Sequence, residues 1–175
     1  KCRKAGLQPA MSVLVATSQA LKLSGGATEK TMMLPDKETL KKGLRNLEKH
    51  ISILKSFGQR VLVSLNKYHF DTEEELAYLR SWCAERDVHF AVNQSFSQGG
   101  AGAVEMAQAV VDICEKPSAP LQHTYNPDDD IETKIRKIVT TIYVGKDVVL
   151  YKKAQEALKK IKALGLEHLP VCMAK

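Results

Sequence analysis

The sequence has no long apolar run. Its longest apolar stretches, at residues 13–16 and 61–65, are far shorter than the ~18 residues of a membrane-spanning helix. The chain opens on Lys1, with no secretory signal and no Arg-rich amphipathic leader. We therefore expect no membrane partner. We also expect the 175 residues to be an internal piece of a longer protein that works in the cytoplasm, with mitochondria as the open alternative.

Cysteine and histidine are too few and too scattered to predict a metal centre. The four cysteines form no CxxC pair, and the five histidines form no HExxH motif. A chain of this length can bury a core of its own and does not need disulfides. We therefore expect no metal site and reduced, mostly buried thiols; the cysteines are Cys2, Cys83, Cys114 and Cys172.

Acidic residues are outnumbered by basic ones, 20 against 26, which gives a net charge of +6. The basic excess gathers at residues 36–60 and 131–164. Such clusters either attract polyanions or form the solvated faces of amphipathic helices. Binding of single-stranded nucleic acid would require aromatic residues interleaved with the basic ones, and the second cluster contains few of them. A nucleic-acid-binding module is therefore the least favoured function, and we expect no nucleic-acid partner.

Apolar runs and helical patterns alternate three times along residues 1–116. Strands are predicted near residues 11–16, 60–65 and 88–92, the first of them covered on both faces, and each is followed by an apolar repeat with helical spacing. This alternation predicts an α/β fold with three layers, in which βαβ units form a mainly parallel sheet. Residues 117–175 are predicted to form a helical annex, with a candidate last strand at residues 170–173.

Polar residues and glycines cluster after each predicted strand, at residues 17–26, 66–72 and 93–102. Ligands of parallel sheets bind beyond the carboxyl ends of the strands. The amide of Asn66 and the carboxylate of Asp71 suit the edge of a purine, or else form a turn that leads into a helix. Tyr68 and Phe96 stand on two neighbouring tips and could hold a flat heterocycle between them.

The nucleotide-hydrolysing motifs are absent from these residues. No GxxxxGK[ST] loop occurs, and Gly25-Gly26 is not followed by the Lys-Ser/Thr that holds a β/γ-phosphate. No nucleophile elbow occurs either. We assign no catalytic residue and predict that the 175 residues alone do not hydrolyse a nucleotide.

Several segments together resemble one enzyme family almost from end to end. They are residues 13–26 (VLVATSQALKLSGG), 43–50 (GLRNLEKH), the corner from Asn66 to Glu73, the loop 99–102 (GGAG) and the ending 169–175 (LPVCMAK). In these segments the chain resembles the central to late part of formate–tetrahydrofolate ligase.

The resemblance implies a P-loop NTPase-like fold and an ATP-dependent parent enzyme. Such an enzyme uses ATP, with Mg²⁺, to phosphorylate formate and passes the formyl group to tetrahydrofolate. The family's phosphate-binding loop lies upstream of the matched part, so we predict that these residues alone are inactive. The implied partners are tetrahydrofolate, formate, ATP and the rest of the parent chain, and a homo-oligomer is left open.

The resemblance also implies a set of site residues. In the family, aromatic residues at the positions of Tyr68 and Phe96 flank the pterin, and Lys22 would meet an anion. The remaining members would form a corner for the nucleotide or heterocycle, and these are Asn66, Asp71, Ser95, Gly99 and Gly100.

The chain departs from the family at several of these tips. Where the family usually reads TVRALKMHGG, residues 17–26 read TSQALKLSGG, so Gln19 replaces arginine and Ser24 replaces histidine. His69 and Phe70 stand where the family has Pro or Lys before the Asp-Thr corner. Glutamine cannot replace the charge-assisted fork of a guanidinium. The alternative is therefore a catalytically degenerate relative that is kept for assembly.

Overall fold

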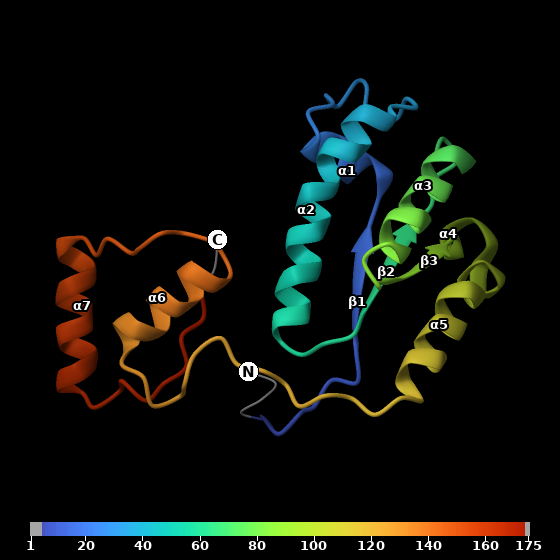
Figure 1. The fold of residues 1–175 in the computed structure, drawn as a ribbon. Coiled ribbons are helices and arrows are strands. Elements are labelled where there is room, and N and C mark those ends of the chain that lie inside the picture. The colour runs from blue at the N-terminus through green and yellow to red at the C-terminus, as the bar shows by residue number, and fades with distance from the viewer. Residues whose placement is uncertain (1–4, 174–175) are drawn as a thin grey trace. The chain divides into compact units, whose positions relative to one another are not determined.

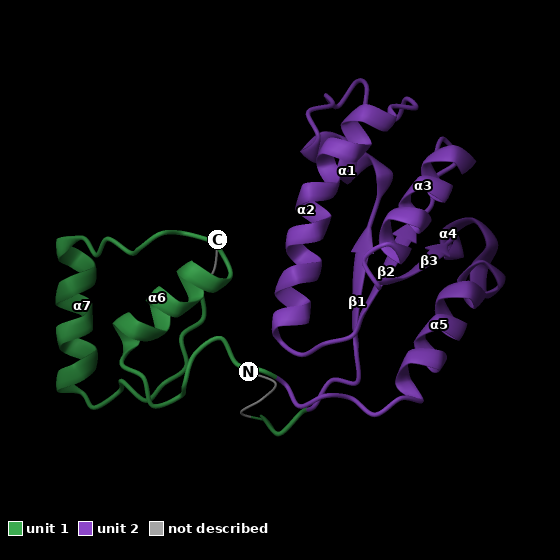
Figure 2. Ribbon diagram, in the orientation of Figure 1, with its two compact units in different colours: residues 1–7, 122–175 green, residues 8–121 purple. Residues whose placement is uncertain are grey.

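The computed structural model describes residues 5–173, which divide into two compact units (Figures 1 and 2). The larger unit spans residues 8–121, and the smaller unit holds residues 5–7 and 122–173. The sequence analysis drew its division between residues 116 and 117. Within the larger unit, Gln8 donates to Ala119 O at 2.7 Å and accepts from Leu121 N at 3.2 Å, which ties residues 119–121 to its first residue.

The larger unit is built on a parallel sheet, as predicted. Strands β1 (Ser12–Ala16), β2 (Val61–Asn66) and β3 (His89–Asn93) lie in the order β1-β2-β3. Ala16 pairs with Leu65, and Asn66 pairs with Asn93. The register therefore brings the carboxyl ends of all three strands to one edge of the sheet.

Polar capping residues mark the beginning of the helices that connect the strands. Helix α1 (Ser18–Ser24) directly follows β1, and α2 (Lys37–Ser56) begins at Asp36, whose carboxylate accepts from two backbone amides. Helix α3 (Glu73–Ala84) begins with a capping box, in which Thr72 and Glu75 bond reciprocally.

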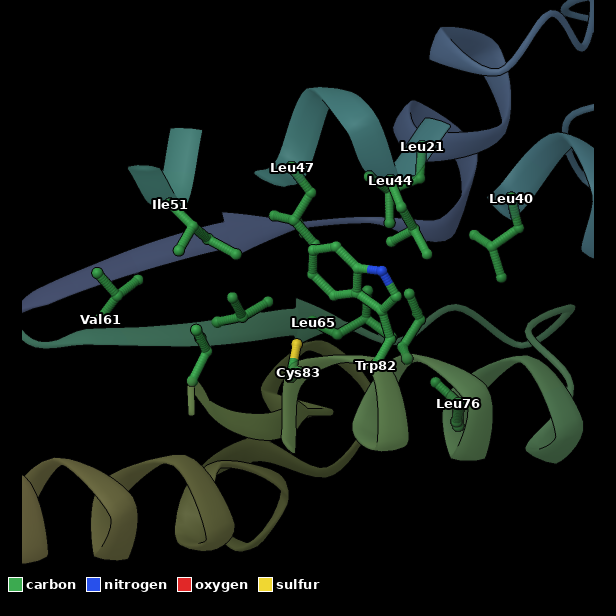
Figure 3. Close-up of a cluster of buried hydrophobic side chains, with 14 of the residues drawn as sticks. Leu21, Leu40, Leu44, Leu47, Ile51, Val61, Leu65, Leu76, Trp82 and Cys83 are labelled. Carbon is green, nitrogen blue, oxygen red and sulfur yellow. The ribbon is translucent and has the colours of Figure 1, made fainter. Parts of the chain in front are cut away.

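Helices α2 and α3 cover one face of the sheet and form the main core with it. Figure 3 shows Trp82 of α3 pointing toward Leu44 and Leu47 of α2. Cys83 is buried beside it, and burial raises the pKa of this thiol to about 11. Cys114 and Cys172 are exposed instead, so the expectation of mostly buried thiols is wrong for the cysteines that the structure describes; Cys2 lies outside that part.

Helix α5 (Val104–Cys114) covers only part of the opposite face. Its Ile113 packs on Leu62 of β2 and Ala91 of β3. Beyond it, Val13 and Val15 of β1 are 44% and 58% exposed. The prediction that the first strand is covered on both faces is therefore wrong, because α5 packs over β2 and β3.

The glycine-rich segment after β3 is helical rather than an irregular loop. It forms α4 (Ser95–Gln98) and a 3-10 helix, η2 (Gly99–Ala103). Gln94 N donates to Gly102 O at 2.9 Å and closes this segment on itself. A side chain on Gly102 would meet the backbone of Gln94 at 2.5 Å, so the turn requires glycine there.

The smaller unit contains α6 (Ile131–Thr141) and α7 (Lys152–Ala163). Buried Lys134 donates to the carbonyls of Glu167 and Leu169 at 2.6 and 3.2 Å, and Tyr125 bonds both backbone groups of Val171. Residues 170–173 form no strand, because Val171 is held by a side chain and not by a neighbouring strand. Helix α7 buries none of its residues.

In residues 5–173, no helix is long and apolar enough to cross a membrane.

Candidate functional site

The tips of β2 and β3 lie side by side and are bonded to each other. Asn93 donates its side-chain amide to Asn66 Oδ1 at 3.1 Å, and the backbone N–H of Lys67 donates to Asn93 O at 2.9 Å. Both asparagines are half-buried. Asn66 thus ends its strand beside Asn93, a residue that the sequence analysis did not single out.

Each of these two tips exposes an aromatic ring. Tyr68 follows Asn66 by two residues and is 42% exposed, and Phe96 on α4 is fully exposed. The Tyr68 ring stacks on Phe70 at 5.4 Å between centroids and 5° between planes, and His69 meets the edge of Phe70 at 5.0 Å. The corner after β2 is therefore an aromatic platform of three consecutive residues.

Asp71 holds this corner in place by two hydrogen bonds to its carboxylate. Its side chain is buried, with one oxygen accepting from the Ser18 hydroxyl and the other from the Tyr68 backbone N–H at 2.8 Å. Of the two predicted roles of Asp71, bonding a heterocycle edge or forming the turn, these contacts favour the turn. They also bring in Ser18, which the sequence analysis did not name as a site residue.

Lys22 lies inside the fold, behind the same edge. Its ammonium is fully buried, 2.7 Å from Glu75 Oε1 and 2.9 Å from the carbonyl oxygen of Leu34. Glu75 also accepts from the backbone N–H of Asp36 at 3.1 Å. Contact between Lys22 and an external anion would require this ion pair to open. In this structure its ammonium joins α1, α3 and the segment that precedes α2.

The other predicted corner residues lie on the surface after β3. The backbone N–H of Ser95 donates to Asn93 Oδ1 at 3.0 Å, which ties the start of α4 to the asparagine pair. Gly99 has φ +57, and both Gly99 and Gly100 have open space where a side chain would stand. A flat ligand can therefore approach the backbone there closely.

Carboxylates occupy the beginning of α3. Glu73, Glu74 and Glu75 fill its first turn, and Asp71 lies just before it. Negative side chains satisfy the positive end of the helix dipole, which would otherwise attract a phosphate. Lys67 pairs with Glu73 at 2.5 Å and is partly neutralised. The corner after β2 therefore suits an uncharged ring better than a phosphate.

No cluster of three or more His, Cys, Asp or Glu side chains that could hold a metal ion is found in residues 5–173. A hollow in the surface beside α3 is lined by apolar and charged side chains of that helix and by Val92 of β3. Its lining includes none of the predicted site residues.

Comparison with known proteins places these features in a family. The family model for formate–tetrahydrofolate ligase matches residues 1–175. Proteins named formate–tetrahydrofolate ligase from Parabacteroides distasonis and Bacteroides thetaiotaomicron are 48% and 49% identical to this chain over its whole length. One with the same name from Campylobacter concisus is 44% identical. The chain covers 32% of the length of each of these relatives. Matched along its whole length, the chain belongs to the formate–tetrahydrofolate ligase family.

Proposed function

We propose that the parent protein is an ATP-dependent ligase that joins formate to tetrahydrofolate. In this reaction ATP phosphorylates formate and leaves ADP, and the formyl group then passes from formyl phosphate to the N10 amine of tetrahydrofolate, releasing phosphate and giving 10-formyltetrahydrofolate. The proposal is supported by the family match over residues 1–175 and by relatives of that name at 48–49% identity. Because the chain spans 32% of these relatives, we propose that it supplies one part of the site.

The part we assign to it is the pterin slot, with a share of the nucleotide site. Tyr68 and Phe96 would stack on the pterin, and the bonded amides of Asn66 and Asn93 would offer hydrogen bonds to a heterocycle edge between them. The open backbone at Gly99 and Gly100, with Ser95 beside it, would border the nucleotide. The observation that carries this assignment is the pair of exposed rings on adjacent, hydrogen-bonded strand tips.

The Mg²⁺ that accompanies ATP would be held mainly by the phosphates. Mg²⁺ keeps several waters and is commonly bound by one or two carboxylates together with substrate phosphates. The described residues gather no group of three or more possible metal ligands.

We further propose that the sheet is the P-loop NTPase-like one that the family resemblance implies. The parallel β1-β2-β3 order is compatible with such a sheet.

Alanine at either ring should weaken tetrahydrofolate binding to the full-length parent. Stacking on an aromatic ring contributes about 1–3 kcal/mol, so we expect the Kd to rise roughly 5- to 150-fold in Tyr68→Ala and in Phe96→Ala. Titration calorimetry with tetrahydrofolate gives these values. The matched control is Tyr151→Ala, because Tyr151 is 80% exposed in the smaller unit. An unchanged Kd in both ring variants would refute the slot.

The 175-residue polypeptide alone should show no ligase turnover. It has no GxxxxGK[ST] loop to hold the β/γ-phosphate of ATP. The measurement is formation of 10-formyltetrahydrofolate from formate, ATP and tetrahydrofolate, with the full-length parent as the positive control. Turnover by the purified 175-residue polypeptide would contradict the proposal that the phosphates of ATP are held by another part of the enzyme.

The alternative function, a degenerate relative kept for assembly, is favoured by one observation. Gln19 and Ser24, both in α1, stand where the family resemblance expects arginine and histidine. The full-length parent distinguishes the two functions, because a degenerate relative would form no 10-formyltetrahydrofolate.

A further inference from the structure

We propose that Ser18 is a positioning residue for folate: its hydroxyl fixes Asp71, and Asp71 fixes the backbone that carries Tyr68. This inference rests on the proposed function, because it assigns to Ser18 an effect on the pterin slot. Ser18 itself is buried, so its effect on the slot would be exerted through Asp71.

The connection runs between two tips of the sheet. Ser18 is the first residue of α1, directly after β1, and its hydroxyl donates to Asp71 Oδ1 after β2. The other oxygen, Asp71 Oδ2, accepts from the backbone N–H of Tyr68 at 2.8 Å. Asp71 N in turn donates to Tyr68 O at 3.1 Å. Both oxygens of one carboxylate therefore hold the turn, one from outside it and one from within.

The bond from Ser18 matters because it ties Asp71 to α1, whereas the bonds of Lys67 to Asn93 and Glu73 hold only the start of the corner. Tyr68 and His69 are exposed, and the Tyr68 ring stacks on Phe70 within the same turn, so this contact moves with the corner. Hydrogen bonds to a charged acceptor are stronger than neutral ones, and a buried carboxylate oxygen left without a donor is costly. Without the Ser18 hydroxyl, Asp71 is expected to turn toward water and to take the Tyr68 backbone with it.

The position of Ser18 also predicts a selective effect. A displaced Tyr68 ring loses stacking on the pterin, while the surface after β3 at Gly99 and Gly100 keeps its own bonds through Gln94 and Gly102. A variant at Ser18 should therefore raise the KM for tetrahydrofolate and leave the KM for ATP unchanged. A merely structural residue would lower the amount of folded enzyme and leave both KM values as they are.

The test uses Ser18→Ala in the full-length ligase. We expect the KM for tetrahydrofolate to rise about 5- to 10-fold, the factor that corresponds to one lost hydrogen bond, with the KM for ATP unchanged. Ser18→Thr keeps the hydroxyl and should restore the KM to within about twofold of the wild type. The matched control is Ser64→Ala, because Ser64 is also fully buried but its Oγ contacts Met106 Sδ at 3.1 Å on the α5 side.

A second measurement does not depend on turnover. Amide hydrogen exchange of Tyr68 should be faster in Ser18→Ala than in the wild type and in Ser64→Ala, because its acceptor Asp71 is released. Unchanged exchange together with an unchanged tetrahydrofolate KM would overturn the role of Ser18. If Tyr68→Ala and Phe96→Ala also leave the folate Kd unchanged, the pterin slot itself is wrong. If Tyr68→Ala weakens binding and Ser18→Ala does not, only the positioning role fails.

Discussion

Replacing Lys22 by methionine is expected to lower the free energy of unfolding by about 3–5 kcal/mol, the usual cost of breaking a buried ion pair from one side. Lys22 and Glu75 are 2.7 Å apart, and their side chains are 0% and 4% exposed. Methionine keeps most of the volume of lysine but leaves the carboxylate of Glu75 buried without its cation. Urea unfolding of the 175-residue chain, followed by circular dichroism, measures the change.

Two variants make this result specific. Lys37→Met removes the same charge from an exposed pair, in which Lys37 and Glu74 are 2.9 Å apart and 45% and 75% exposed, and should cost less than about 1 kcal/mol. Adding Glu75→Gln to Lys22→Met removes the uncompensated charge and should recover part of the loss. If Lys22→Met costs no more than Lys37→Met, the buried pair is not what joins α1 to α3.

Gly43→Ala is expected to cost about 3 kcal/mol, at the upper end of what overpacking a core costs. A Cβ on Gly43 of α2 would stand 1.8 Å from the carbonyl oxygen of Leu21 in α1. The obstacle is backbone, so no side-chain rotation relieves it, and α1 must move away from α2. Since α1 carries Ser18 and Lys22, the same substitution should disturb the corner after β2.

Thermal unfolding compares Gly43→Ala with Gly100→Ala. Gly100 has nothing within 4 Å of its Cβ position, so alanine there should be nearly neutral. Within an open helix, alanine is favoured over glycine by about 1 kcal/mol, so the sign at Gly43 depends on the contact with Leu21. A Gly43→Ala chain as stable as the wild type would mean that α1 and α2 are not in backbone contact.

The fold was largely predictable because its signals are local. The leucine repeat at 40, 44 and 47 lies within α2 and forms its buried face. Asp36 and Thr72 directly precede the helices that they cap. The alternation of strands and helices then implied parallel pairing. The exposed face of β1 at Val13 and Val15 was not predictable, because apolar content alone does not say which helix covers which strand.

The candidate site was predictable only in outline. Parallel topology implied that Tyr68 and Phe96 stand at one edge of the sheet, and the register of β2 and β3 agrees. The partners of Asp71 and Lys22 were not predictable, because each pairs with a residue 53 positions away, Ser18 and Glu75 respectively. In a single sequence, such pairs give no periodic signal. Lys22, which the family resemblance assigned to an anion, therefore lies in the interior of this structure.

The most direct test of the pterin slot is a double-mutant cycle on tetrahydrofolate binding. The Kd is measured for the full-length wild type, Tyr68→Ala, Phe96→Ala and the double variant. If both rings contact the same pterin, each single variant weakens binding, and the double variant departs from the sum of the two by more than about 0.5 kcal/mol. Single variants that bind like the wild type, or two losses that simply add, would contradict a slot shared by the tips of β2 and β3.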